Sequence, residues 1–544
     1  MSRNISRLIG VKNISFLMVL SMVGLLLIAG CGGSPETAPA PQTPLAQAEG
    51  TGAEDVPRDP VVIRLEGGDW GYCSPFTHYS RGPGIFKMQL IFDSLLERSE
   101  DGYVPWLAES WEISDDGKTY LFNLQQGVKW HDGKEMTADD VVFSINYYRE
   151  YPPVSIFFGG ILTDPDYLLE VTAVSDYQVR FVTSEAKATF LPAAGLARII
   201  PRHIWENVDN PHDYLEPEAV IGCGPYRLTD YNKEHGTYRF ESFEDYWGIQ
   251  PRVDVIEFVP VSDTILAFEN GEIDLTEIPT DLLSRFQEDP EFAVKVNPGF
   301  WGYRLLFNYE RIEVFSNKAL RQALAYAIDR QDLADKIARG AGTPGNPGIL
   351  PVHHVWCNPD VPQYAYDPER AKQMLQQEDL TDLSLTLLVG QDREVRIGEL
   401  LSEQLAKVDI QLRVESVDLQ SRDSRIRDGQ YELALVGHGG WGGDPDYLRS
   451  RFLSELSDWY TGTPGYYNPQ VDELGQRQLS ETDVNKRKEL IFQLQQVLAE
   501  DVPEIPLYNT TGYTVYRPDK YDGWMYMFDH HNLTHSKLSF LDWK

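Results

Sequence analysis

Apolar side chains after residue 60 recur with two periods, one typical of strands and one typical of helices. Residues 119–124 alternate, with Tyr120, Phe122 and Leu124 on one face, which predicts a half-buried strand. Short apolar runs elsewhere have the length and composition of buried strands. They predict strands at residues 61–65, 255–259, 300–307, 383–389, 410–414 and 433–436.

Helix starts can be recognised from capping residues. Asp367 precedes Pro368, and this pair suits a helix start because Asp accepts from free backbone N–H groups and Pro fits the first helical position. Thr137 and Asp140 have the spacing of a capping box. Apolar stripes with helical spacing predict further helices at residues 86–96, 320–328, 329–337, 397–405 and 490–498.

The order of these elements indicates the fold class. Between residues 383 and 436 the pattern is strand, helix, strand, strand, which is typical of an α/β domain with a partly parallel sheet. Nearly five hundred of the 544 residues follow residue 60. This length favours two or three domains.

The first thirty residues differ in composition from the rest. Arg3, Arg7 and Lys12 precede an apolar run at residues 14–28, and no acidic residue occurs there. The run ends in Ile28-Ala29-Gly30-Cys31, which resembles the lipobox of bacterial lipoproteins. Residues 1–30 are therefore predicted to be a signal peptide and Cys31 a lipidation site; the alternative is an ordinary cleaved signal. Residues 31–60, rich in Pro, Gly and Ala, are predicted to be a disordered tether.

Charge and cysteine content narrow the function classes. The formal net charge of −35 argues against nucleic acid and anionic membranes as partners, because both require a basic surface. After Cys31 only Cys73, Cys223 and Cys357 remain, and their spacing matches no zinc site. We expect buried free thiols, with one disulfide as the alternative.

Enzyme and metal signatures are missing from the sequence. It contains no His-Glu-x-x-His, phosphate-binding loop or Gly-x-Ser-x-Gly motif, so neither an enzyme, a metal nor a cofactor is predicted. The pairs His353-His354 and His530-His531 are poor chelates, since adjacent side chains on a strand point to opposite faces. Gly437, Gly439 and Gly442 have dinucleotide-fingerprint spacing, but Pro445 interrupts the helix start that a pyrophosphate needs.

A series of short motifs follows in order along the chain. They are Asp115-Asp116-Gly117-Lys118, residues 127–133, Thr137-Ala138-Asp139-Asp140-Val141, Gly224-Pro225-Tyr226, Asp245-Tyr246-Trp247-Gly248, Gly271-Glu272-Ile273-Asp274, residues 321–330, Tyr366-Asp367-Pro368 and Tyr467-Asn468-Pro469. Together they resemble family 5 (peptide/nickel) of the solute-binding proteins of ABC transporters. The resemblance extends from about residue 60 to about residue 515.

This resemblance implies a fold. It is the type II-like periplasmic-binding-protein fold, with two α/β lobes around a ligand cleft and a small inserted domain. Lobe I would comprise residues 61–97, 219–297 and 505–544, the inserted domain residues 98–218, and lobe II residues 298–504.

The resemblance also implies a function. A monomer, lipid-anchored outside the cytoplasmic membrane in the periplasm or at the cell surface, would capture a small solute and deliver it to ABC permease subunits with their ATPases. An oligopeptide or dipeptide is the leading solute class. The alternatives are a nickel chelate, an oligosaccharide, or a sensor role in which the ligand state is passed to a membrane receptor.

Candidate ligand-binding residues occur in loops that match cleft-lining positions of the family. In its peptide-binding members an aspartate three residues before the Asp-Pro pair binds the ligand's ammonium group, but this sequence has Trp441 there. Asp69 is the nearest replacement, unless the ligand has no such amine. His438 is the residue that would ligate a nickel chelate. The full candidate set is Asp69, Trp70, Tyr72, Trp301, Tyr303, His438, Trp441 and Asp444.

Overall fold

The computed structural model describes residues 59–79, 83–154, 160–438, 443–455, 463–530 and 532–543. All of them fall within one compact unit, residues 46–544. The predicted signal peptide, Cys31 and nearly all of the predicted tether lie outside the described residues. Within the described ranges, every helix is too short or too polar to span a bilayer.

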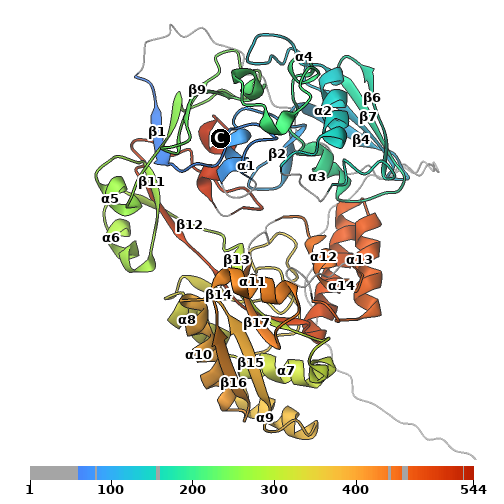
Figure 1. The fold of residues 1–544 in the computed structure, drawn as a ribbon, viewed down its shortest axis with the longest axis vertical. Helices are drawn as coiled ribbons and strands as arrows, with labels where there is room; N and C mark the ends of the chain where they lie inside the picture. The colour runs from blue at the N-terminus through green and yellow to red at the C-terminus, as the bar shows by residue number, and fades with distance from the viewer. Residues whose placement is uncertain are drawn as a thin grey trace, which may run out of the picture. The chain divides into compact units, whose positions relative to one another are not determined.

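Strand β1 (Val62–Glu66) forms one edge of a four-stranded sheet with the order β1-β10-β9-β8, which we call the lobe I sheet (Figure 1). β1 pairs with β10 in parallel, with Val62 opposite Val255. The strands predicted at residues 61–65 and 255–259 are confirmed. The elements of this lobe are β8 (Tyr226–Asn232), β9 (Thr237–Ser242), β10 (Val255–Val259), α1 (Pro83–Met88), the pair β2 (Leu96–Arg98) and β3 (Tyr103–Pro105), α5 (Thr264–Glu269), η3 (Thr280–Leu282), α6 (Leu283–Gln287), η5 (Leu533–His535) and η6 (Lys537–Phe540).

The helix predicted at residues 86–96 is wrong: α1 ends at Met88. Leu90 and Ile91 are buried, as their apolar character suggests, but their carbonyl oxygens accept hydrogen bonds from the backbone of Tyr226 (3.0 Å) and Gly224 (2.7 Å). A Cβ atom on Gly224 would lie 2.6 Å from the Leu90 oxygen, so only glycine permits this approach. A distant segment therefore donates to the carbonyl oxygens that would otherwise accept hydrogen bonds within a helix. The sequence of residues 86–96 alone does not indicate this contact.

A separate small domain carries its own antiparallel sheet, ordered β4-β5-β7-β6. Helix α2 (Ala138–Glu150) packs on β6 and β7. The Asp140 carboxylate accepts from the backbone N of Thr137 (2.9 Å), which confirms the predicted capping box. The remaining elements are β4 (Ala108–Ile113), β5 (Thr119–Leu124), β6 (Leu168–Ser175), β7 (Gln178–Thr183), α3 (Phe190–Gly195), α4 (Arg202–Trp205), η1 (Pro211–Asp213) and η2 (Pro217–Val220).

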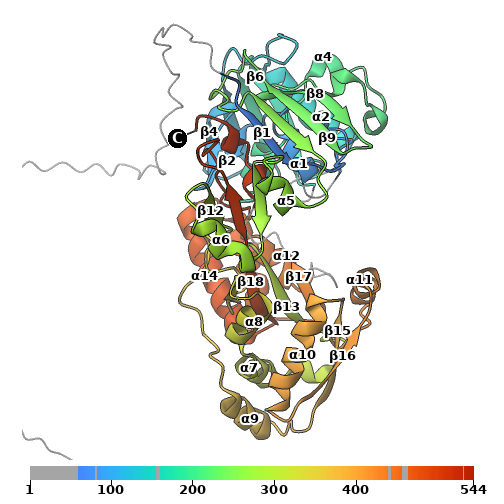
Figure 2. The ribbon, with the colours of Figure 1, turned by 90° about the vertical axis from the view of Figure 1, so that its left-hand side faces the viewer.

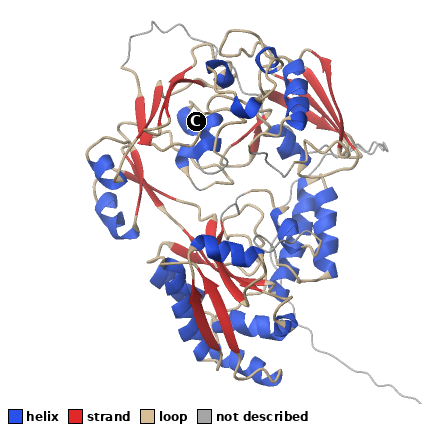
Figure 3. Cartoon of the chain, viewed as in Figure 1, coloured by secondary structure: helices blue, strands red, loops and turns tan. Residues whose placement is uncertain are grey.

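A second α/β lobe, lobe II, is built on a six-stranded sheet ordered β14-β18-β13-β17-β15-β16. β15 pairs in parallel with β16 and β17, which confirms the partly parallel sheet, and helices flank it (Figure 3). The elements are β13 (Trp301–Phe307), η4 (Glu313–Ser316), α7 (Lys318–Ala327), α8 (Arg330–Ile337), β14 (Gly342–Pro344), α9 (Pro368–Gln377), β15 (Ser384–Val389), α10 (Arg393–Ala406), β16 (Gln411–Ser416), α11 (Leu419–Arg427), β17 (Leu433–His438), α12 (Tyr447–Phe452), α13 (Pro469–Ser480), α14 (Val484–Asp501) and β18 (Glu504–Thr510).

The chain crosses between the lobe I and lobe II sheets twice, beside a three-stranded sheet ordered β11-β19-β12 (Figure 2). Its strands are β11 (Leu275–Ile278), β12 (Ala293–Val296) and β19 (Tyr513–Tyr516). One crossing joins β12 to β13 and the other joins β18 to β19, and the backbone N of Asn297 donates to the Gly512 oxygen (2.8 Å) between them. Because β18 pairs with β13 and β14, we place the return to lobe I after Thr510 rather than at residue 505.

Lobe II encloses a buried ion triad. The Glu504 carboxylate on β18 forms ion pairs with Arg304 on β13, whose Nη1 is 3.0 Å from Glu504 Oε2, and with Arg451 on α12. All three side chains are at most 1% exposed. Charges in such a dry environment must be matched, so the triad fixes α12 against the sheet.

Lobe I has a corresponding buried cluster at the C-terminal end of the chain. The Lys537 Nζ atom lies 2.5 Å from Asp93 Oδ1 and 2.7 Å from Glu97 Oε2, and all three side chains are at most 2% exposed. Burial alone would raise the pKa of Glu97, but Lys537, Arg198 and Arg98 outweigh it and hold the pKa at about 2. The cluster joins the C-terminal segment to the first segment of lobe I.

Cys73, Cys223 and Cys357 are free thiols, and Cys73 and Cys223 are buried. The prediction of buried free thiols is confirmed for these two residues. No group of histidine, cysteine or acidic side chains suited to a metal ion occurs among the described residues.

Candidate functional site

The loop after β1 carries three of the predicted ligand-binding residues, Asp69, Trp70 and Tyr72. Tyr238 fixes its backbone, because the hydroxyl accepts from the Trp70 N (2.8 Å) and donates to the Gly71 oxygen (2.8 Å). Gly67 approaches Val259 so closely that a Cβ atom would lie 2.7 Å from its oxygen. The loop is therefore held in one conformation by the sheet below it.

Asp69 and Tyr72 line a pocket of about 540 Å³ that has walls from lobe I and from the small domain, together with Tyr231, His212 and Lys233. The exposed Asp69 carboxylate accepts from the Tyr231 hydroxyl (2.7 Å). The rings of Tyr72 and Tyr231 are 5.6 Å apart. Trp70 is outside this lining and packs edge-on against Tyr79, with ring centroids 5.9 Å apart. Burial raises the pKa of Tyr72 to about 12, so its hydroxyl stays neutral at physiological pH.

Trp301 and Tyr303 lie on β13, with ring centroids 4.8 Å apart and nearly perpendicular planes. Tyr303 is 7% exposed and also packs against Tyr508, so most of its ring belongs to the core of lobe II. Trp301 is only partly buried. The backbone of His438 is opposite Gly302, whereas Trp441 lies outside the described residues.

We expect Gly437→Ala to destabilise lobe II by about 1–3 kcal/mol, the usual cost of overpacking. A Cβ atom there would lie 2.5 Å from Trp301 Cζ2 and 3.2 Å from Tyr303 Cε1. The measurement is the thermal unfolding midpoint. Gly512→Ala is the matched control, because its nearest contact would be 3.6 Å from Asn297 Cβ. Equal midpoints for the two variants would contradict the prediction.

Asp444 is not a free carboxylate. Its oxygens accept two hydrogen bonds from the Arg487 guanidinium on α14, at 2.5 and 2.8 Å. Each side chain is only 6% exposed. Arg487 also donates to Gln478 Oε1 (3.1 Å), so the pair belongs to a network that joins α13 and α14. Asp444 therefore has the geometry of a structural anchor at the end of the glycine-rich loop.

Two cavities between the small domain and lobe II share Gly443 and Asp444 in their walls. The first, of about 330 Å³, is mostly apolar and also reaches lobe I through Tyr103 and Phe528. The second, of about 570 Å³, is more polar. The first is lined by Tyr103, Ile113, Tyr120, Leu191, Trp356, Asp444, Val484, Arg487, Lys488 and Phe528, and the second by Asp164, Lys187, Thr189, Asp444, Asp446, Tyr447 and Arg449, among others.

Of the predicted site residues whose side chains the structure describes, Asp444 alone lines these two cavities. Sequence analysis missed Tyr103, Trp356 and Arg487, which surround it. Burial, together with the Asp529 and Asp444 carboxylates, raises the pKa of Tyr103 well above its ordinary value, so it remains a neutral donor. Aromatic faces beside an ion pair suit a ligand with both apolar and polar groups.

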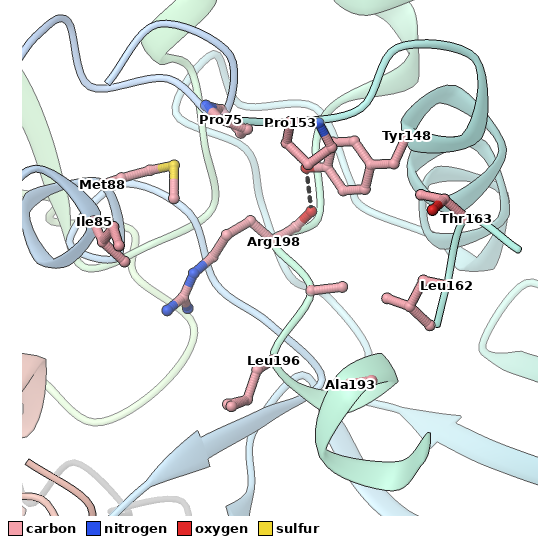
Figure 4. Close-up of a pocket in the computed structure, with 11 residues that line it drawn as sticks. Pro75, Ile85, Met88, Tyr148, Pro153, Leu162, Thr163, Ala193, Leu196 and Arg198 are labelled. Atoms are coloured by element: carbon pink, nitrogen blue, oxygen red, sulfur yellow. Dashed lines mark hydrogen bonds between the residues drawn. The ribbon is translucent and has the colours of Figure 1, made fainter. Parts of the chain in front are cut away.

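A further pocket is lined by residues of lobe I and the small domain (Figure 4). Its lining is mostly apolar and includes Met88, Leu162 and Leu196, while the Tyr148 hydroxyl donates to the Arg198 oxygen (2.6 Å) at one side. The cavity volume is about 40 Å³, which is enough for a water molecule but not for a peptide or sugar. This pocket is therefore excluded as a solute site.

Comparisons with known proteins agree with this architecture. A family model described as "Bacterial extracellular solute-binding proteins, family 5 Middle" matches residues 102–459. The dipeptide-binding protein of Escherichia coli (strain K12) is 30% identical over 491 residues, covering 82% of this chain and 90% of that protein. Heme-binding protein A of Haemophilus influenzae is 28% identical over 463 residues, covering 79% and 83%.

A solved structure extends the comparison to the fold. The ABC transporter substrate-binding protein CtaP of Listeria monocytogenes is similar with a TM-score of 0.71 and 26% identity. The match covers 84% of this chain and 94% of that one.

Proposed function

Because the chain belongs to family 5 of the bacterial extracellular solute-binding proteins, we propose that it captures a small peptide between its lobes and delivers it to an ABC importer. The observation that carries the peptide assignment is the 30% identity to a dipeptide-binding protein over 82% of this chain. The family and its mixed α/β fold confirm the resemblance drawn from the sequence. Members of this family are solute-binding proteins and not enzymes.

The geometry supports capture by lobe closure. In the described part of the chain, two crossings connect the lobe I and lobe II sheets, and such a pair of linkers acts as a hinge. The cavities around Asp444 are bounded by lobe II on one side and the small domain on the other. Closing the hinge buries a ligand between the lobes, and the importer recognises the closed form. A lipid on Cys31 keeps the protein near that importer.

The chemistry of the site bears on how a peptide amine is bound. Asp444 is already paired with Arg487, and the position of the family's amine-binding aspartate is occupied by Trp441. Asp69 is exposed, and its carboxylate accepts hydrogen bonds from Tyr231 and Gly71 N, which leaves acceptor capacity for an ammonium group. Asp69 is therefore the residue proposed to bind the amine, with Trp70 and Trp441 offering aromatic faces.

We expect di- to tetrapeptides to stabilise the exported chain after it has been unfolded and refolded to remove carried ligand. A peptide at 100 times its dissociation constant adds about 2.7 kcal/mol, which a thermal shift detects easily. Expression without residues 1–31 removes the apolar run and the predicted lipidation site, so that the protein can be purified without detergent. The same screen includes nickel with L-histidine and oligosaccharides as competing ligand classes.

Asp69→Asn tests the amine contact, and the matched control is Asp230→Asn on the outer face of β8. Asp69→Asn should weaken peptide binding by at least tenfold, while Asp230→Asn should leave it unchanged. A thermal shift with nickel–histidine or a sugar, and none with any peptide, would replace the peptide assignment and direct attention to His438 or Trp441.

A further inference from the structure

Lobe II contains a pocket that is separate from the cavities around Asp444. It has a volume of about 700 Å³ and shares no lining residue with those cavities. The beginning of α8 forms one wall, and the segments after β14 and before α9 form the others. All of its lining residues belong to lobe II, so the pocket does not depend on lobe closure.

Arg330, in the wall of this pocket, lacks an anionic partner among the described residues. Its Nη2 donates to the Ala325 oxygen (3.1 Å), but its buried Nε has no acceptor. Burial lowers the pKa of Arg330 to about 10, and the guanidinium therefore remains charged at neutral pH. By contrast, the nearby Arg321 is paired with Asp501 (3.1 Å). A partly buried cation without a counter-charge is costly, and an anion in the pocket would offset that cost.

The other lining residues define what kind of anion fits. Asp329 also lines the pocket, but its carboxylate caps α8 by accepting from the Asp332 N (3.0 Å) and forms no ion pair with Arg330. Arg330 is the one cationic residue among the described lining residues, and a single guanidinium matches a single carboxylate better than a phosphate dianion. Tyr364, Tyr366 and Val352 add apolar surface.

We propose that this pocket is a second binding site, which takes a small molecule with one carboxylate and an apolar body. Arg330 binds the carboxylate through its fork of N–H donors, and the tyrosine rings pack against the body of the ligand. Lys407, whose Nζ is 3.3 Å from the Tyr366 hydroxyl, adds positive charge at the rim. The site is independent of the solute cleft, so both can be occupied together.

Cys357 provides a reporter, because it lines the same pocket and is only partly buried. The full chain is alkylated with iodoacetamide at constant ionic strength, and the rate at Cys357 is read by peptide mass mapping. Phenylacetate is the probe and neutral phenylacetamide its control. At nine times the dissociation constant only one-tenth of the pockets are free, so phenylacetate should slow alkylation about tenfold.

Arg330→Gln should abolish this protection, whereas Arg339→Gln, at an exposed arginine of the same lobe, should keep it. If Arg330→Gln does not fold, Ala365→Trp replaces it: residue 365 is exposed and lines the pocket, and the larger side chain should remove phenylacetate binding measured by calorimetry. The proposal is overturned if phenylacetate gives no protection, if phenylacetamide or inorganic phosphate protects equally well, or if Arg330→Gln remains protected.

Discussion

Replacing Glu504 with alanine is expected to destabilise lobe II by about 3–5 kcal/mol, the cost of breaking a buried ion network by removing one partner. Arg304 and Arg451 would keep their charges with almost no solvent access, since they are at most 1% exposed. Neither can lose its proton at any ordinary pH. The measurement is the midpoint of urea unfolding followed by circular dichroism.

The control for Glu504→Ala is Glu170→Ala, which removes an ion pair whose side chains are each 44% exposed. Exposed pairs contribute little, so this variant should change stability by less than about 1 kcal/mol. Replacing all three members of the triad with apolar residues of similar size should recover much of the loss, because no unmatched charge then remains. A Glu504→Ala midpoint equal to that of Glu170→Ala would show that the triad is not a stability determinant.

Lys537→Met should reduce the free energy of unfolding by a similar amount. It should also change how that free energy depends on pH in the acidic range. The variant leaves Asp93 and Glu97 buried without the ammonium group that lies 2.5 and 2.7 Å from them. A loss of about 3–5 kcal/mol at neutral pH follows from breaking one side of this cluster. Unfolding of lobe I, measured by thermal denaturation, reports it.

The pH dependence follows from the lowered pKa of Glu97, about 2 in the folded protein against an ordinary value of 4.5. Its contribution to wild-type stability is complete above pH 4.5 and is lost as the pH falls toward 2, because the unfolded state then binds the proton first. Without Lys537 the folded pKa rises, so the acid-induced loss begins at a higher pH. Superimposable midpoint-versus-pH curves for the two proteins would contradict this account.

Much of the fold could be predicted because the relevant signals are local. Asp367 accepts from Arg370 N (2.9 Å) as the predicted cap of α9, and Asp329 caps α8 in the same way. Alternation placed the strand at residues 119–124 correctly. The helix predicted at 86–96 failed because Gly222 and Gly224, more than a hundred residues away, bring another backbone against it.

The site was harder to predict, because ligand-binding side chains are positioned by partners distant in sequence. Asp69 and Trp70 were proposed from the loop after β1, but the Tyr231 hydroxyl that donates to Asp69 comes from β8. Arg487 left one signal: it falls on the apolar stripe of α14, one turn before Leu490 and Ile491. A charge on the buried face of a predicted helix is a reason to look for a buried partner, and here that partner is Asp444.

The path of the chain also sets an order of events during folding. Lobe I begins with β1 but is completed only by residues near the C-terminus. β19 is the central strand of the three-stranded sheet that it forms with β11 and β12. Lys537 forms an ion pair with Asp93, which lies 444 positions earlier in the sequence. Lobe II, from β13 to β18, is by contrast contiguous in sequence. During synthesis lobe II can therefore complete its core first, while the N-terminal segment of lobe I remains incomplete until the residues after Thr510 have been made. An incomplete chain cannot form the folded core of lobe I. A truncation near the C-terminus is therefore expected to disrupt the folding of segments in the N-terminal half of the chain.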